Sequence, residues 1–200
     1  MLHCHQWLEA TNSSGRETPF GRTPDAALAL HCGPVLMGQK PAALLSLPTR
    51  QLDAARGILD ALRGPRCRVL RQSAAALLLV YDEPSLAYAL AAPVPRAVLA
   101  KLGYPVSGSL NAMLAHLVAR IASSRDFPHE VGFFLGYPQR DVLGFMAHRG
   151  RDCKLSGAWK VYGDVESAKA LWSHYRQCSD RLLAEVFQCG GLIPAMAACG

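Results

Sequence analysis

The stretch FPHEVGFFLGYPQRDVLGFM, residues 127–146, contains the signals that start, end and join helices. Pro128 suits the first turn of a helix, because the first backbone amides there have no intrahelical partner. Gly136 follows an apolar run, at the point where helices commonly end in a left-handed residue that glycine adopts at low cost. Pro138 then starts a second helix, and Gly150 ends it. The stretch therefore predicts two short helices joined by a tight corner.

The corner occurs twice in the chain. PRAVLAKLGYPVSGSLNAM (residues 95–113) aligns without gaps to PHEVGFFLGYPQRDVLGFM (residues 128–146), with Pro, Val, Leu, Gly, Tyr, Pro, Leu and Met identical. A duplicated helix–corner–helix unit explains the match, and so does convergence on one favourable corner. The sequence leaves both explanations open.

The composition predicts one globular domain. The chain has 200 residues, of which 50% are hydrophobic and 18% charged, so it can bury a sizeable core. No apolar run reaches the roughly 18 residues of a membrane span, so no membrane partner is expected. The chain start lacks the basic-then-apolar layout of a secretory signal, which favours a cytoplasmic protein.

The net charge and the cysteines indicate whether to expect a nucleic-acid partner, disulfide bonds or a metal site. The net charge of +6 is spread along the chain, which favours a solvated basic surface over a nucleic-acid partner. The seven cysteines are odd in number and scattered, so we expect free thiols. No CxxC pair is present, and we expect no metal site.

Apolar patterns predict an α+β fold, with a small, mostly antiparallel sheet packed against several helices, including the helix–corner–helix at LGYP. Residues 75–81, AALLLVY, are apolar throughout and predict a central strand. Asp164 should cap the longest helix. We expect a loose N-terminal tail over residues 1–23, a single α+β domain over residues 24–188 and a C-terminal tail over residues 189–200.

The helix that follows the first corner has an apolar stripe through Met113, Leu117 and Ile121. His116 and Arg120 fall on the other side of that helix. We therefore expect His116 to be solvated and not to act as a ligand.

Three blocks of the sequence resemble an uncharacterised bacterial family, domain of unknown function 3793. They are HCGPVLMGQKPAALLSL (residues 31–47), FPHEVGFFLGYPQRDVLGFM (residues 127–146) and CKLSGAWKVYGDVESAKALWSHYRQC (residues 153–178). The resemblance spans about residues 30–178 and implies no particular activity or cofactor, since none is established for the family. Its recurring positions correspond here to Cys32, Pro34, Lys40, Pro41, His129, Glu130, Gly132, Gly136, Tyr137, Pro138, Trp159, Lys160 and Tyr162.

The leading functional hypothesis is a binding module for a small anionic ligand, a cofactor or a protein partner. The sequence has no phosphate loop, GxSxG or HExxH motif, so catalytic residues and cofactors stay unassigned. We expect one pocket built by the three blocks, with charged and aromatic walls. The ligand-binding candidates are Cys32, Lys40, His129, Glu130, Tyr137, Trp159 and Lys160.

Two alternatives belong to other functional classes. Residues 129–148 are similar in spacing to a helix-turn-helix, which would present Gln139, Arg140 and Gly144 to DNA. Alternatively, Cys32 could act as the nucleophile of a thiol enzyme with a spatially adjacent histidine as base.

Overall fold

The apolar strand β3 (Ala75–Tyr81) is the middle strand of a three-stranded antiparallel sheet with the order β1–β3–β2. The computed structural model of the chain describes residues 23–124 and 126–199. Leu78 of β3 lies opposite Leu45 of β1 on one side and Val69 of β2 on the other. The predicted central strand is confirmed. Its sequence does not alternate with polar residues because both faces of the sheet are covered.

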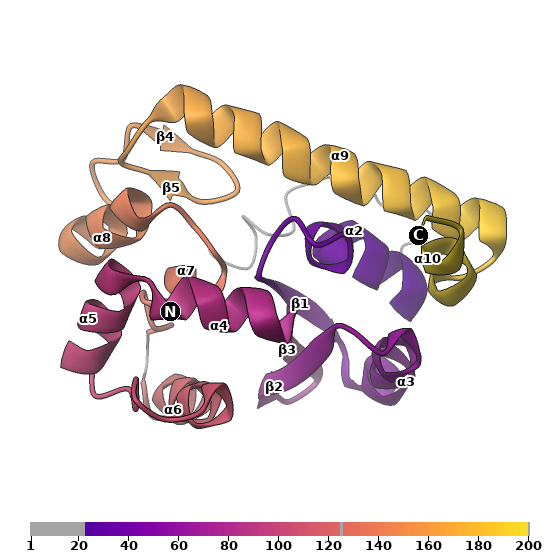
Figure 1. Cartoon of the computed structure of the whole chain (residues 1–200), viewed down its shortest axis with the longest axis horizontal. Helices are drawn as coiled ribbons and strands as arrows, with labels where there is room; N and C mark the ends of the chain where they lie inside the picture. The colour runs from indigo at the N-terminus through magenta and orange to yellow at the C-terminus, as the bar shows by residue number, and fades with distance from the viewer. Residues whose placement is uncertain (1–22, 125, 200) are drawn as a thin grey trace.

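Helices account for most of the described chain, and the α+β fold is confirmed (Figure 1). The elements are α2 (Pro24–Leu36), β1 (Ala42–Pro48), the short 3-10 helix η1 (Thr49–Gln51), α3 (Leu52–Leu62), β2 (Arg66–Gln72), β3, α4 (Glu83–Ala91), α5 (Pro93–Lys101), α6 (Leu110–Ser123), α7 (Val131–Phe134), α8 (Gln139–His148), β4 (Leu155–Ser156), β5 (Lys160–Val161), α9 (Val165–Cys189) and α10 (Leu192–Cys199).

The sheet separates two hydrophobic cores. Leu77 and Leu79 of β3 face a core that includes side chains from α4 to α8 and from β5. Leu78, which points the other way, packs among side chains from α2, α3 and α10. The alternating orientation of β3 side chains therefore explains why helices pack against both faces of the sheet.

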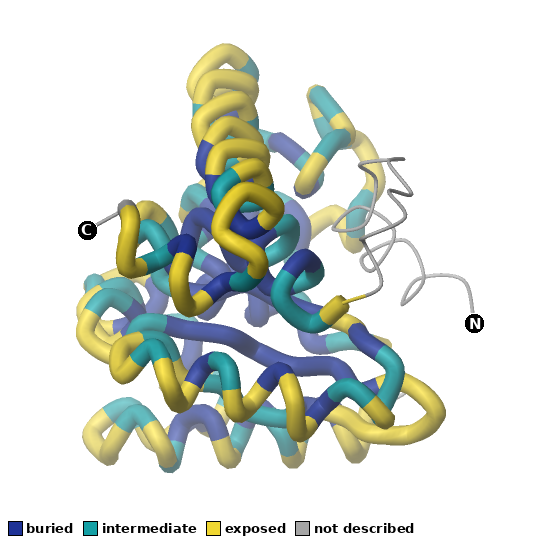
Figure 2. Tube along the Cα trace, turned by 90° about the vertical axis from the view of Figure 1, so that its right-hand side faces the viewer, coloured by how far each residue is buried: buried dark blue, intermediate teal, exposed yellow. Residues whose placement is uncertain are grey.

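Helix α9 spans both cores and runs along one side of the molecule (Figure 1). Ala168 belongs to the first core and Leu182 to the second. The helix begins as predicted, with the Asp164 carboxylate accepting a hydrogen bond from the amide of Ser167 at 2.7 Å. Its outward turns are largely exposed (Figure 2).

Both predicted corners are Schellman motifs, in which a left-handed glycine ends a helix. Gly103 has φ +83° and Gly136 has φ +68°. The tyrosine that follows each glycine donates its amide hydrogen bond back into the helix, from Tyr104 to the Leu99 carbonyl at 3.0 Å and from Tyr137 to the Gly132 carbonyl at 2.9 Å. The corner at Gly136 predicted from sequence is confirmed.

The two helix–corner–helix units, residues 95–113 and 128–146, differ after their corners. Helix α8 begins directly after Pro138, whereas a turn closed by a 2.8 Å hydrogen bond from the Gly108 amide to the Pro105 carbonyl precedes α6. Ser109 then caps α6, and its Oγ accepts a 3.2 Å hydrogen bond from the amide of Ala112. The structural likeness is therefore concentrated in the corner itself.

The expected C-terminal tail over residues 189–200 is replaced by a packed helix. Within α10, Leu192 and Ala195 are fully buried. The amide of Leu192 also donates a 2.8 Å hydrogen bond to the Asp25 carboxylate. The apolar segment of α10 forms a helix because its side chains pack into the core beside α2 and α9. The expected N-terminal tail, residues 1–22 in particular, lies outside the described residues.

We predict that Gly136→Ala destabilises the protein more than Gly103→Ala. Both changes place an L-residue at positive φ, which costs about 1–2 kcal/mol. A Cβ at position 136 would also lie 2.5 Å from Cγ of Pro41, whereas at position 103 the nearest atom is Cε1 of His116 at 3.9 Å. Overpacking adds about 1–3 kcal/mol. Urea unfolding of the two variants measures the difference, and equal losses would contradict the role of Pro41.

Candidate functional site

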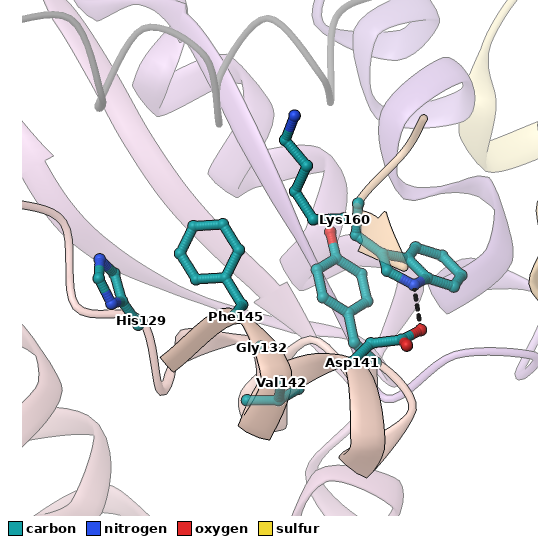
Figure 3. A pocket seen from close by; sticks show the side chains of 8 residues that line it. His129, Gly132, Asp141, Val142, Phe145 and Lys160 are labelled. Carbon is teal, nitrogen blue, oxygen red and sulfur yellow. Dashed lines mark hydrogen bonds between the residues drawn. The ribbon is translucent and has the colours of Figure 1, made fainter. Parts of the chain in front are cut away.

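A small hollow lies between the second corner, α8 and β5 (Figure 3). About 220 Å³ of empty space lies in and in front of it, most of it open to solvent. The part that the side chains close off is about 10 Å³, roughly the room that one water molecule needs, so the hollow is a shallow depression. The residues that line it are His129, Gly132, Tyr137, Asp141, Val142, Phe145, Trp159 and Lys160.

Two glycines determine how closely the elements around the hollow approach. A Cβ at Gly132 would lie 2.8 Å from Cγ2 of Val142, so α7 and α8 can cross closely only without a side chain there. A Cβ at Gly144 would lie 2.3 Å from Cγ of the Tyr162 ring. Helix α8 is therefore packed against α7 on one side and against the β4–β5 hairpin on another.

The buried Asp141 carboxylate connects α8 to that hairpin. Its Oδ2 accepts a 2.7 Å hydrogen bond from the Trp159 indole, which is the bond drawn in Figure 3. Its Oδ1 accepts from the backbone amides of Tyr162 at 2.8 Å and Gly163 at 2.7 Å. Asp141 is only 3% exposed. Three donors occupy the carboxylate, which therefore positions the Trp159 ring rather than offering a free base.

Aromatic rings connect the hollow to α9. Trp159 stacks on Tyr137 with ring centroids 4.7 Å apart and an interplanar angle of 25°. Trp159 also meets Trp172 edge to face, at 5.3 Å. Burial raises the pKa of Tyr137 above its ordinary value, so the phenol stays protonated.

The Lys40 ammonium lies against two of these aromatic rings. Its Nζ is 5.1 Å from the centroid of Tyr137 and 5.4 Å from that of Tyr175. Among the described residues no carboxylate forms an ion pair with Lys40. The ammonium is thus held by ring faces, and a cation–π contact contributes about 0.5–1 kcal/mol at exposed sites and more when desolvated.

Burial lowers the pKa of Lys40 from 10.5 to about 8. The ring faces oppose this effect because they attract the charged form. Burial also raises the pKa of the Cys32 thiol to about 12, with the nearby Lys40 charge acting in the opposite direction. The thiol therefore stays neutral and supplies no anionic partner to the lysine.

The structure brings together most, but not all, of the candidates chosen from sequence. His129, Tyr137, Trp159 and Lys160 line the hollow. Lys40 joins them through its contact with the Tyr137 ring. Cys32 and Glu130 do not line it, so the single pocket expected for all candidates is formed by a subset.

Cys32 lies in the core on the other face of the sheet and is 0% exposed. A nucleophilic cysteine needs access and a lowered pKa, and this thiol has neither. The structure gives the thiol-enzyme hypothesis no support at this residue.

Glu130 belongs to a different cluster. It is 2% exposed and accepts hydrogen bonds from Nε of Arg120 at 2.6 Å and from the Tyr104 hydroxyl at 2.9 Å. The His116 ring lies 4.4 Å from that of Tyr104, and its Nε2 is buried without a hydrogen-bond partner in the described part of the chain. The expectation that His116 is solvated was wrong, because Tyr104 of the first corner covers its ring.

Sequence reasoning missed Asp141 and Tyr175 as parts of the site. Asp141 is an acid in the first turn of a helix, a position that the helix dipole alone explains. Tyr175 lies within the apolar stripe of α9, where an aromatic residue needs no special role. Neither local pattern indicates which residue the side chain contacts, because the contacting residue lies in a distant part of the chain.

The helix-turn-helix hypothesis for residues 129–148 requires an open face on α8. Gln139 and Arg140 are exposed. Gly144 lies under the Tyr162 ring and does not face outward as that hypothesis expects. The hairpin thus covers part of the surface that a groove-reading helix would present.

Over residues 23–124 and 126–199 no group of three or more His, Cys, Asp or Glu side chains could hold a metal ion. Within the same ranges no helix has the length and apolar character of a membrane span.

We predict that Asp141→Ala costs about 2–4 kcal/mol of unfolding free energy, because it leaves buried N–H donors without an acceptor. Asp180→Ala is the matched control on the exposed side of α9 and should change stability by about 0.5 kcal/mol or less. Urea unfolding followed by tryptophan emission measures both. Equal stability of the two variants would show that Asp141 does not hold the hairpin.

We predict that native alkylation labels Cys189 well before Cys32 and Cys178. Cys189 is exposed, whereas Cys32 is 0% and Cys178 is 7% exposed. Iodoacetamide labelling mapped by peptide mass gives the order, and the same reaction in urea should make the three rates similar. Labelling of Cys178 as fast as Cys189 in the native protein would contradict the burial of Cys178.

The comparisons with known proteins agree with the sequence blocks. A search of curated proteins and a search of solved structures each found no match. The family model described as "Protein of unknown function (DUF3793)" matches residues 28–192, a range that contains every residue lining the hollow. The match covers most of the 200-residue chain, from α2 to the first residue of α10. The chain therefore belongs to the DUF3793 family.

Proposed function

We propose that this protein is a binding module that binds a small anionic ligand at the mouth of the hollow beside the second corner. The observation that carries the proposal is the charge balance of the lining. Lys160 has no ion-pair partner among the described residues. The one carboxylate that lines the hollow, on Asp141, already accepts three hydrogen bonds. An anion would therefore meet an ammonium with which no described carboxylate forms an ion pair.

The walls favour a flat ligand. The Trp159 and Tyr137 rings are stacked, and His129 meets Phe145 edge to face with centroids 4.8 Å apart. Flat apolar groups pack well against such rings, while a carboxylate or phosphate bonds to an ammonium. Because the closed-off space is about 10 Å³, a ring-sized ligand would lie across the mouth of the hollow and not inside it.

Lys40 adds positive charge behind the aromatic wall. Its Nζ lies 5.1 Å from the centroid of the Tyr137 ring, which itself lines the hollow. Because the lysine pKa is about 8, most of the lysine is charged at neutral pH. An anion on the other residues of the hollow would be attracted by this charge as well as by Lys160.

A cytoplasmic location is proposed with this role, as the sequence predicts. A protein partner that inserts an acidic side chain is the alternative occupant of the same hollow. Neither DNA binding nor thiol chemistry is favoured by a specific contact, for the reasons given at α8 and at Cys32.

The proposal is tested with benzoate as the flat anion and benzamide as its neutral match. Tryptophan fluorescence and calorimetry at low ionic strength should detect saturable benzoate binding that weakens as salt is added. Inorganic phosphate, used in parallel, distinguishes a preference for phosphate from one for carboxylate. Benzamide should bind at least several times more weakly than benzoate.

We predict that Lys160→Met weakens binding of the preferred probe about 5- to 10-fold, which corresponds to about 1–1.4 kcal/mol for one charge-assisted contact. Lys101→Met, on the exposed side of α5, is the matched control and should leave binding unchanged. The proposal fails if neither anion saturates the protein at millimolar concentration, or if the two variants bind alike. Native mass spectrometry of the freshly purified protein gives an independent readout of a retained ligand.

A further inference from the structure

The loop before α7 supplies one side chain to each of two clusters. His129 lines the hollow, where its ring meets that of Phe145 edge to face at 4.8 Å (Figure 3). The next residue, Glu130, accepts its hydrogen bonds in the buried cluster beneath the first corner. Consecutive Cα atoms are only about 3.8 Å apart, so whatever fixes Glu130 also limits where His129 can lie.

A hydrogen-bonded turn makes this link stiff. The Glu130 carbonyl accepts a 3.0 Å hydrogen bond from the amide of Phe133, and the His129 carbonyl accepts one from the amide of Gly132 at 3.4 Å. Gly132 packs closely against Val142 of α8. The loop and α7 therefore form one unit, and a shift at Glu130 is passed on to the wall of the hollow.

The groups that hold Glu130 come from outside this unit. Its Oε1 accepts a 2.6 Å hydrogen bond from Nε of Arg120 on α6 and a 2.9 Å hydrogen bond from the hydroxyl of Tyr104. The Tyr104 ring in turn contacts the Arg120 guanidinium and the His116 ring, with its centroid 5.9 Å from the first and 4.4 Å from the second. Because Glu130 is only 2% exposed, its carboxylate cannot exchange these donors for water unless the cluster opens.

We propose that Glu130 is a positioning residue of the anion site, through which α6 and the first corner hold His129 at the mouth of the hollow. The carboxylate does not line the hollow and would not touch the ligand. Its role is to fix the loop, so that the His129 ring stays against Phe145. The two helix–corner–helix units then have linked tasks, since Tyr137 of the second lines the hollow and Tyr104 of the first fixes the loop.

Charge alone and positioning predict opposite effects of the same substitution. Glu130→Gln removes a negative charge close to the hollow, which by charge alone should strengthen the binding of an anion. As a positioning residue, Glu130 loses its ion pair with Arg120 in this variant, so the loop loosens and anion binding weakens. The direction of the change therefore distinguishes the two effects.

The first measurement is the NMR resonance of the His129 ring in the full chain, which needs no ligand. The ring current of Phe145 shifts this resonance as long as the two rings stay in contact. At about pH 8.5, where an ordinary histidine is neutral, Glu130→Gln and Tyr104→Phe should both move it toward its position in urea. Tyr88→Phe makes the same chemical change at a tyrosine that is 84% exposed, and it should leave the resonance in place.

Two further variants keep this measurement decisive. Tyr104→Phe removes only a hydroxyl and keeps the ring beside His116, so it reports on the loop even if Glu130→Gln does not fold. Leu192→Ala lies in the core on the other face of the sheet. It should lower stability without moving the His129 resonance, which separates positioning from a general weakening of the fold.

The second measurement is benzoate affinity, and this readout alone rests on the proposed function. Glu130→Gln and Tyr104→Phe should weaken benzoate binding about 3- to 10-fold, whereas Tyr88→Phe and Leu192→Ala should not change it. If benzoate fails to bind the unmodified protein, the proposed function fails while the His129 resonance still decides the inference. An unchanged resonance in Tyr104→Phe, or stronger benzoate binding by Glu130→Gln, overturns the positioning role of Glu130.

Discussion

The close contact between Gly136 and Pro41 is the constraint on which the site depends. Gly136 ends its helix at positive φ, and the absence of a side chain lets the Pro41 ring lie where a Cβ would be 2.5 Å away. The contact joins the second corner to the loop before β1. Lys40 precedes Pro41 in the sequence, and Tyr137 follows Gly136. The same contact therefore places Lys40 beside Tyr137.

A second interaction completes the site from the other side. The Asp141 carboxylate accepts hydrogen bonds from the Trp159 indole and from two backbone amides at the end of the hairpin. These bonds hold the indole against the Tyr137 ring. The carboxylate accepts its hydrogen bonds from these uncharged donors and not from a lysine. This arrangement leaves the ammonium groups of Lys40 and Lys160 without a described carboxylate partner, which is the electrostatic feature that the proposed anion site uses.

Much of the fold could be predicted because it depends on local chemistry. The left-handed corner follows from Gly136, the start of α9 from Asp164, and the central strand from an unbroken apolar run. The C-terminal helix α10 was not predicted, because its short apolar segment is stable only against the core it completes. The solvated position expected for His116 was wrong for the same reason, since the Tyr104 ring that covers it comes from outside its helix.

The sequence by itself determined where helices end, where the chain turns and which strand is buried, since backbone dihedrals, caps and apolar runs are set within a few residues. Only the tertiary structure decided which charged side chains meet. It joined Glu130 to Arg120 and Asp141 to Trp159, and it left Cys32 in a separate core. Those contacts form only when segments far apart in the sequence pack together. No local sequence pattern specifies which side chain will lie opposite which.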